Sequence, residues 1–564
     1  MKFSEYPYVR PDMDELEQRF RAALEQFSAA ATADEQDQLM ADINRQRMEF
    51  NSMQSIASIR HTVDTRDEFY ATEQDFFDEN SPRMQGLTTE FYRVLVESPF
   101  RKTLEAKWGR QLFRLAETTL KTFDPSVLPL LQKENALVSA YQKLMASAEI
   151  DWQGDKLNLS QMGPYLQSVT REVRKEAQQK LWAYFQENAE EYDRLYDELV
   201  HLRAQIAREL GFSNFTELAY ARLNRTDYDA SMVANFRRQV AQHLVLLSVR
   251  LKERQRERLH LDTLLYYDES LTFLSGNPAP KGDPQWILEN GVEMYRELSP
   301  ETDEFFQTMV RDELLDLLSK KGKAVGGYCT NIPKYEAPYI FANFNGTYDD
   351  VTVLTHEAGH AFQSYMSRKY PVPEYYFPTL EACEIHSMSM EFLTWPWMDR
   401  FFQEDAEKFR FMHVSGALQF IPYGVAVDEF QHAIYAHPDL TPAERKAKWR
   451  EVEEKYLPLR KYEDNEFLEE GGYWQIQTHI YMEPFYYIDY TLAQICAFQF
   501  WLKAERNRTD AWRDYLHLCR LGGSKSFLEL VQEANLQSPF DDGCVASVVE
   551  PLAQWLESVD DTKF

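Results

Sequence analysis

The sequence predicts a mainly α-helical fold, and three observations support this prediction. Apolar residues recur at steps of three and four along most of the chain, as at Leu16, Phe20 and Leu24. Alternating patterns typical of strands occur in only two short stretches. The chain has 564 residues, of which 14% are aromatic, so it is long and apolar enough to bury a large core and is not disordered.

Helical stripes follow one another from the N-terminus. The first begins after Pro11, a residue that favours the first turn of a helix. Further stripes cover residues 43–53, 91–120, 130–145, 169–210 and 232–261. Gly211 is expected to end the stripe that precedes it, because glycine is common just after a helix.

The two strand signals lie at residues 149–159 and 323–347. The first flanks Gly154-Asp155 and predicts a small hairpin. Gly163-Pro164 follows and is typical of a domain boundary, so we predict an N-terminal helical lobe over residues 1–165 and a second helical domain over residues 166–564. The second signal predicts a small β-sheet next to the one chemical motif of the chain.

The composition excludes several functions. The chain carries 61 Lys and Arg against 91 Asp and Glu, a formal charge of −30, so we expect no nucleic acid as a partner. Five cysteines without a CxxC pair argue against a zinc ribbon or a disulfide framework. The N-terminus lacks the apolar stretch of a signal peptide, and the most apolar segment, residues 485–501, is short for a membrane span. We expect a cytoplasmic protein that does not bind membranes.

The chemical motif is His356-Glu357-Ala-Gly-His360. The residues before it predict a helix, and residues four apart on a helix lie on the same face. His356 and His360 can therefore hold one cation through two imidazole nitrogens. Glu357 lies beside them and can act on a metal-bound water, as zinc hydrolysis requires.

A third metal ligand is expected from the helix predicted over residues 379–391. A catalytic zinc ion usually has three protein ligands and one open position. Glu384 is central on the acidic face of this helix and is the predicted ligand, whereas His386 points nearly to the opposite side. Glu381, one turn earlier, is predicted to accept a hydrogen bond from a ligating histidine.

Together these motifs resemble the thimet oligopeptidase and oligoendopeptidase F family of zinc peptidases. The spacing from His360 to Glu384 and the run from Glu384 to Glu391 are similar to that family. So are residues 344–356 before the motif and the helical stretches 170–177 and 207–215, and the similarity covers about residues 150–550. The size and the tyrosine-rich C-terminal part are similar to the Pz-peptidase branch.

The resemblance implies an elongated, two-lobed helical molecule with a deep channel and one catalytic zinc ion per chain. It implies hydrolysis of internal bonds in short peptides, with His356, His360 and Glu384 as ligands and Glu357 as general base. The family also has a histidine and one or two tyrosines that stabilise the oxyanion. His479 matches that histidine, Tyr487 is the predicted donor, and Tyr486 and Tyr490 are predicted neighbours at the substrate.

Residues 341–344 are predicted to form an edge strand along which an extended peptide lies, with Ala342 and Phe344 at the substrate. Binding by strand addition uses main-chain hydrogen bonds and therefore tolerates many side chains. Gly327 could let the peptide approach closely, and Tyr328 follows it.

Two alternatives remain open at this point. A zinc carboxypeptidase would use the same metal motif but needs a basic group for the substrate's C-terminus, which the sequence does not place. A helical peptide-binding protein without catalysis would carry the HExxH motif by accident. The oligomeric state is also left open.

Overall fold

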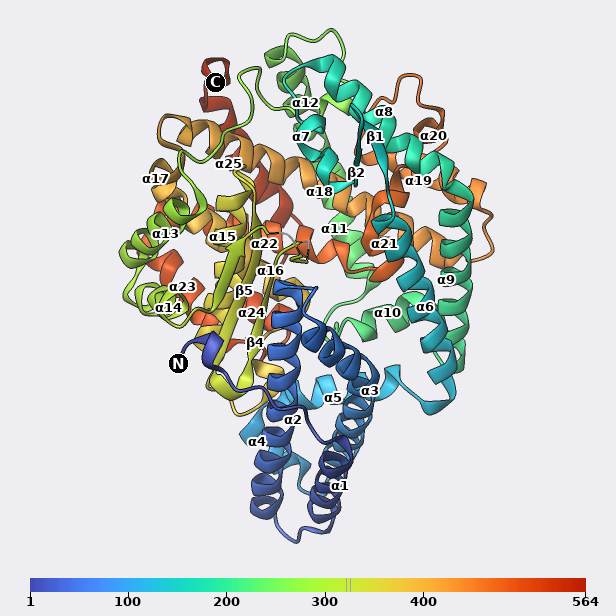
Figure 1. Ribbon diagram of the computed structural model, residues 1–564, viewed down its shortest axis with the longest axis vertical. Coiled ribbons are helices and arrows are strands. Elements are labelled where there is room, and N and C mark those ends of the chain that lie inside the picture. The colour runs from blue at the N-terminus through green and yellow to red at the C-terminus, as the bar shows by residue number, and fades with distance from the viewer. Residues whose placement is uncertain (321, 325) are drawn as a thin grey trace.

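The computed structural model describes residues 1–320, 322–324 and 326–564 and is built mainly from helices (Figure 1). The N-terminal part contains α1 (Met13–Ala29), α2 (Ala33–Val63), α3 (Glu68–Val96), α4 (Arg101–Trp108) and α5 (Arg110–Thr122). These blue helices form the lower end of the long axis in Figure 1. Asp12 caps α1 by accepting from the backbone N–H groups of Asp14 and Glu15, which fixes the first helix where the sequence predicts it.

A second group of elements forms the upper and right-hand part of the molecule in Figure 1. It comprises α6 (Leu128–Ala146), the strands β1 (Ile150–Trp152) and β2 (Asp155–Leu157), α7 (Gly163–Leu166), α8 (Arg171–Glu187), α9 (Ala189–Glu209), α10 (Phe215–Arg222), α11 (Ala230–His243) and α12 (Val245–Arg258). β1 and β2 pair as the predicted antiparallel hairpin, and Gln153 and Gly154 both take the positive φ that its turn requires. The predicted domain boundary near residue 165 stays a prediction.

Three predicted helical stripes are interrupted. Residues 91–120 contain the end of α3, then α4 and α5, because Pro99 cannot continue a helix and Gly109 adopts a φ of +91°. The stripe 169–210 breaks between α8 and α9 at Asn188, and the stripe 232–261 breaks at Leu244. Gly211 does end α9, with a φ of +80° and the hydrogen bonds of a Schellman motif.

The remaining elements carry the metal motif. They are α13 (Pro284–Leu298), α14 (Pro300–Arg311), β3 (Leu315–Leu318), β4 (Tyr328–Ile332), β5 (Ala337–Phe344), α15 (Asp349–Ser367), α16 (Leu380–Leu393), α17 (Met398–Phe402), α18 (Ala406–Ala436), α19 (Pro442–Tyr456), α20 (Glu466–Glu469), α21 (Thr478–Met482), α22 (Tyr487–Arg506), α23 (Arg508–Leu521), α24 (Phe527–Glu533) and α25 (Cys544–Ser558). The mainly α fold with a small sheet beside the HExxH helix is thus confirmed.

The sheet order corrects one prediction. β5 pairs with β3 on one side and with β4 on the other, so the strand predicted to lie at the edge is the central strand. Ala342 and Phe344 are accordingly buried. The alternation of residues predicts a strand but not its neighbours, because strand order depends on how distant segments pair. The edge strands are β3 and β4.

Among the residues that the structure describes, no helix combines the length and the apolar character that a bilayer crossing requires.

Candidate metal centre and active site

Two adjacent helices bring the three predicted metal ligands together. α15 carries His356 and His360, α16 carries Glu384, and one ligand atom from each lies within 4.8 Å of the others. Glu384 Oε2 lies 3.3 Å from His356 Nε2 and 3.6 Å from His360 Nε2. The two histidines and the carboxylate therefore face one point, as a three-ligand metal site requires.

The glycine of the HExxH motif allows this close approach. A Cβ atom built on Gly359 would lie 2.6 Å from Ser387 Cα and 2.7 Å from the His386 carbonyl oxygen. Any side chain at this position would therefore push α16 away from α15. Ser387 also donates a hydrogen bond of 2.9 Å to Glu384 Oε2, which orients the carboxylate toward the histidines.

The partner of His356 is Glu391 and not the predicted Glu381. His356 Nδ1 lies 2.7 Å from Glu391 Oε1, so the imidazole donates there and leaves Nε2 free to bind a metal. Glu391 lies on the same face of α16 as Glu384, two turns further on. This spacing is the feature of the sequence that indicates Glu391 as a partner of a ligating histidine.

A longer chain of contacts fixes Glu391 itself. Its second oxygen lies 2.7 Å from His413 Nε2, and Trp395 Nε1 donates to His413 Nδ1 over 2.9 Å. Because an indole N–H can only donate, His413 Nδ1 must accept, and His413 Nε2 then carries the proton that Glu391 accepts. The sequence gives no signal for His413, because it comes from the distant helix α18.

Glu381 points to a different part of the core. It is buried beside Asp489 and Arg225, and burial together with the charge of Asp489 raises its carboxyl pKa. Helical spacing placed Glu381 on the same face as Glu384, but a difference of three residues turns it enough to face α22. The predicted hydrogen bond to a ligating histidine is therefore wrong.

The charges at the site favour a cation. Burial opposes a charge on His356, yet the carboxylates of Glu384 and Glu391 raise its pKa well above the ordinary value. Burial lowers the pKa of His360 to about 4, so this imidazole is neutral, as a ligand must be. Although burial alone would raise the pKa of Glu384, His360 and a hydrogen bond to His356 bring it down to about 2.

Glu357 lies beside this group with its carboxylate available. It is buried, its Oε2 has no hydrogen-bond partner among the described residues, and burial raises its pKa to about 7. A carboxylate whose pKa lies near the pH of a cell can both accept and return a proton, as a general base in hydrolysis must.

The opposite wall of the site contains His479 in a defined tautomer. Tyr423 donates to Gln477 Oε1 over 2.8 Å, and Gln477 Nε2 lies 2.8 Å from His479 Nδ1. The amide can only donate to this nitrogen, so His479 Nε2 carries the proton. Burial lowers the pKa of His479, which keeps the ring neutral and its Nε2–H available as a donor.

Three tyrosines follow, and their contacts differ. Tyr486 donates to Glu384 Oε1 over 3.2 Å, and its ring lies 5.0 Å from that of Tyr490. Burial and the negative charge of Glu384 both raise the pKa of Tyr490. The ring of Tyr487, the predicted donor, packs 5.0 Å from His479, 5.6 Å from Phe420 and 5.8 Å from Tyr423, and it also lines the cavity described below. Tyr486 is thus bonded to a metal ligand and packs on Tyr490, whereas Tyr487 packs on His479.

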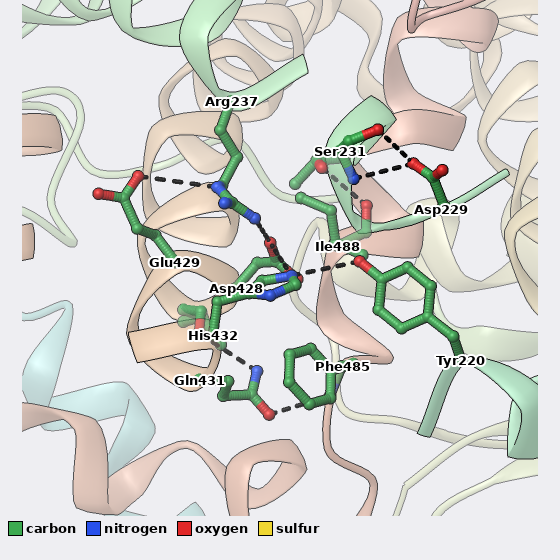
Figure 2. A network of polar contacts seen from close by, with 12 residues as sticks. Tyr220, Asp229, Ser231, Arg237, Asp428, Glu429, Gln431, His432, Phe485 and Ile488 are labelled. Carbon is green, nitrogen blue, oxygen red and sulfur yellow. Dashed lines mark hydrogen bonds and ion pairs between the residues drawn. The ribbon is translucent and has the colours of Figure 1, made fainter. Parts of the chain in front are cut away.

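A buried polar network holds the segment that carries these tyrosines. Phe485 has a φ of +69°, unusual for a bulky residue, and its backbone N–H donates to Gln431 Oε1 over 2.9 Å. Arg225 donates to the Phe485 carbonyl and to Asp489, each over 2.6 Å. Figure 2 shows Gln431 beside Asp428 and His432 on α18, with Phe485 against them. Tyr486 thus follows a backbone conformation that α18 and Arg225 fix.

The predicted substrate residues at the sheet are only partly exposed to the site. A Cβ on Gly327 would lie 3.6 Å from Glu357 Oε1. The backbone of the protein at Gly327 therefore passes close to the predicted general base. Tyr328 stacks on Phe341 at 4.8 Å and bonds Thr62 through its hydroxyl at 2.7 Å, so it supports the edge of the sheet.

A cavity of about 710 Å³ adjoins the site. Its walls include His356, Glu391, His479 and Tyr490 at one end and Gln255 and Arg258 of α12 at the other. The cavity therefore crosses from the metal-binding helices to the helices of the opposite flank and has the size of a short peptide segment.

A helical fold that brings an HExxH pair, a carboxylate of the next helix and a wall of hydrogen-bond donors to one cavity defines a metallohydrolase-type site. Comparison with known families agrees with this. The family described as "Peptidase family M3" matches residues 165–273 and 289–550, and "Peptidase M3 N-terminal domain" matches residues 3–123. The chain belongs to peptidase family M3.

Individual relatives support the assignment. Group B oligopeptidase PepB of Streptococcus agalactiae is 23% identical over 381 residues, which cover 66% of this chain and 61% of PepB. Oligopeptidase PepF of Bacillus subtilis is 21% identical over 409 residues, which cover 67% of this chain and 57% of PepF. The chain thus spans about three fifths of the length of these two relatives.

Solved structures match over the whole chain. The structure of Pz peptidase A with an inhibitor has a TM-score of 0.95 at 59% identity, and the match covers 100% of both chains. Oligoendopeptidase-F from Enterococcus faecium has a TM-score of 0.64 at 14% identity, over 98% of this chain and 99% of that one, and shows the shared fold alone.

Proposed function

We propose that this protein is a zinc-dependent endopeptidase that hydrolyses internal bonds of short peptides in the cytoplasm. The observation that carries the proposal is the convergence of three metal-ligand atoms within 4.8 Å, next to Glu357, whose Oε2 has no partner among the described residues, and beside a cavity of peptide size that His356 lines. Membership of a peptidase family supports it and argues against a peptide-binding protein without catalysis.

The residues fit zinc. Two imidazoles, which bind a metal in their neutral form, and one carboxylate are a donor set that zinc hydrolases use. Glu391 fixes the tautomer of His356 in which Nε2 is free to bind the metal. When bound, zinc supplies Lewis acidity, which lowers the pKa of a water molecule and polarises the peptide carbonyl.

The protein side chains then divide the remaining work. Glu357 accepts a proton from the attacking water and can return it to the leaving amine. His479, through its Nε2–H, and the hydroxyl of Tyr490 are donors for the negative charge that develops on the carbonyl oxygen. Tyr486 bonds Glu384 and lies against Tyr490, so it connects the ligand to the donor wall. This proposal moves the donor role from Tyr487 to Tyr490.

The substrate is proposed to lie extended along β4, the edge strand that follows Gly327, and to pass this glycine beside Glu357. Main-chain pairing with a strand edge selects little among side chains, which suits hydrolysis of many short peptides.

A peptide that is blocked at both ends tests the proposal against the carboxypeptidase alternative. Purified protein with measured zinc content is incubated with an N-acetylated, C-amidated peptide, and products are identified by mass spectrometry. Cleavage at an internal bond supports the endopeptidase. Release of single C-terminal residues from unblocked peptides, with no cleavage of the blocked one, would overturn it.

A further inference from the structure

A second cavity with a cationic wall adjoins the catalytic cavity. The second cavity has a volume of about 270 Å³ and shares Glu269, Gly416, Gln419 and Phe420 with the first. Beyond these shared residues lie Lys252 of α12 and Arg460, which follows α19. Phe420 lines both cavities, and its ring packs on that of Tyr487, so the second cavity lies close to the tyrosines of the site.

Two cations share one carboxylate in this wall. Arg460 donates to Glu269 over 2.9 Å and 3.3 Å through two nitrogens. Among the described residues, Lys252 Nζ pairs with this carboxylate alone, at the long distance of 3.4 Å. Arg460 also lies 3.6 Å from Glu453, which Arg450 and Tyr462 bond. Lys252 is thus the weakly paired cation of this wall.

Lys252 retains donor capacity toward the cavity. Its ammonium has three protons and one weak partner, and its side chain lines the cavity and is 18% exposed. Arg460 also lines the cavity, but its Nη1 is buried and lies 3.6 Å from Glu453, so it adds positive charge rather than a free donor. Burial lowers the pKa of Lys252 although Glu269 opposes this, so a further anion would stabilise its charge.

A further arginine near the site, Arg258, already has hydrogen-bond partners within the protein. Arg258 lines the first cavity, but its Nε donates to the Thr272 carbonyl over 2.6 Å and its Nη1 is bonded to Asp561. Arg258 therefore has less to offer a ligand than Lys252 and Arg460.

We propose that Lys252, supported by Arg460, binds the carboxylate of a peptide substrate whose chain extends from the metal centre into the second cavity. The sign of the charge sets the polarity: a free α-carboxylate is attracted to this wall, and a free α-ammonium group is repelled. This inference rests on the proposed peptidase function. It explains how an endopeptidase of broad sequence range can favour short peptides, since only a peptide of suitable length places its C-terminus here.

The test uses the zinc-loaded full-length protein and N-acetylated fluorogenic peptides that are lengthened one residue at a time on the C-terminal side. Each length is prepared as free acid, as amide, and as amide with glutamate in last place, which separates an α-carboxylate from a side-chain carboxylate. At one length the KM of the acid should be about tenfold below that of the amide. K252M should remove this difference, and K252R should keep most of it.

Lys446 offers a matched control. It is a partly buried lysine that is paired with Asp193 at 2.8 Å and lies away from both cavities, so K446M should leave the ratio of acid to amide unchanged. Equal KM values for acid and amide at every length, or a ratio that persists in K252M, would overturn the inference. A preference for the glutamate amide alone would also overturn it as stated, because the bound group would be a side chain. Cleavage of the amides reports the proposed endopeptidase function separately.

Discussion

The two walls of the catalytic cavity are constructed differently. One wall consists of α15 and α16, regular helices in which His356, His360, Glu384 and Glu391 occupy positions one or two turns apart. The other wall, residues 477–490, consists of the short helix α21, a non-helical turn and the first turn of α22, and in its turn Phe485 has a positive φ and is bonded to Gln431 of α18.

The two walls differ in what fixes the positions of their side chains. On the helical wall, spacing along the chain already sets which side chains face the metal position. On the tyrosine wall, the direction of each hydroxyl depends on contacts with α18 and α10–α11 residues that lie far away in sequence. Substitutions should therefore affect metal binding and donor placement independently, and five predictions test this.

The largest effect is expected at the general base. Glu357→Gln removes the proton acceptor but keeps the shape of the side chain, so kcat should fall by about 10³-fold while zinc content stays at one per chain. Steady-state kinetics and metal analysis check this. The exposed residue Glu289 of α13 supplies the control variant Glu289→Gln, whose kcat should equal that of the wild type. Activity within tenfold of wild type would refute the assignment of Glu357.

The second prediction compares two tyrosines on the tyrosine wall. Tyr490→Phe should lower kcat by about 10²-fold, because a donor to the developing oxyanion is lost. Tyr487→Phe should change kcat by less than about threefold, because the contacts of Tyr487 with His479, Phe420 and Tyr423 are made by its ring, which phenylalanine keeps. The reverse order would return the donor role to Tyr487.

The third prediction concerns the helical wall alone. Glu391→Gln weakens the contact that orients His356, so zinc affinity should fall by about 10- to 100-fold. Competition with a chelator measures the affinity directly. Once zinc is saturating, most of kcat should return. His413→Phe should lower zinc affinity in the same way but by a smaller factor, because His413 acts through Glu391. Unchanged affinity in both variants would contradict the role of this chain of contacts.

The fourth prediction tests the support of the tyrosine wall. Gln431→Leu removes the acceptor of the Phe485 N–H, so the strained segment should relax and kcat should fall by about tenfold with zinc affinity unchanged. Gln36→Leu is the matched control, since Gln36 is also a buried glutamine, bonded to the Phe27 carbonyl in the N-terminal helices. If both variants lose equal activity, the effect comes from stability and not from placement.

The smallest effect concerns the pH dependence of stability. The pKa of Glu381 is raised in the folded protein, so above its ordinary range the fold retains a proton that the unfolded chain releases. Stability should therefore decrease as the pH rises from about 4.5 toward 8. Glu381→Gln should remove this part of the decrease, whereas Glu25→Gln at an exposed position should not. Urea midpoints at several pH values check this, and parallel curves for wild type and Glu381→Gln would refute it.

The sequence alone determined the parts that depend on local spacing. The helix after Pro11, the hairpin at residues 150–157 and the HExxH helix follow from periodicity and turn residues. The group of His356, His360 and Glu384 was predicted correctly in space, because two neighbouring helices of regular geometry carry it. Zinc itself and the catalytic roles remain predictions that the experiments above address.

Only the tertiary structure decided what depends on distant partners. It gave β4 the sheet edge instead of β5, paired His356 with Glu391 instead of Glu381, and brought His413 from α18 to Glu391. It also placed Lys252 and Arg460 at one cavity, although 208 positions separate them in the chain. Helical spacing fixes a side chain's direction only to within a fraction of a turn, and it carries no information about which helix packs opposite.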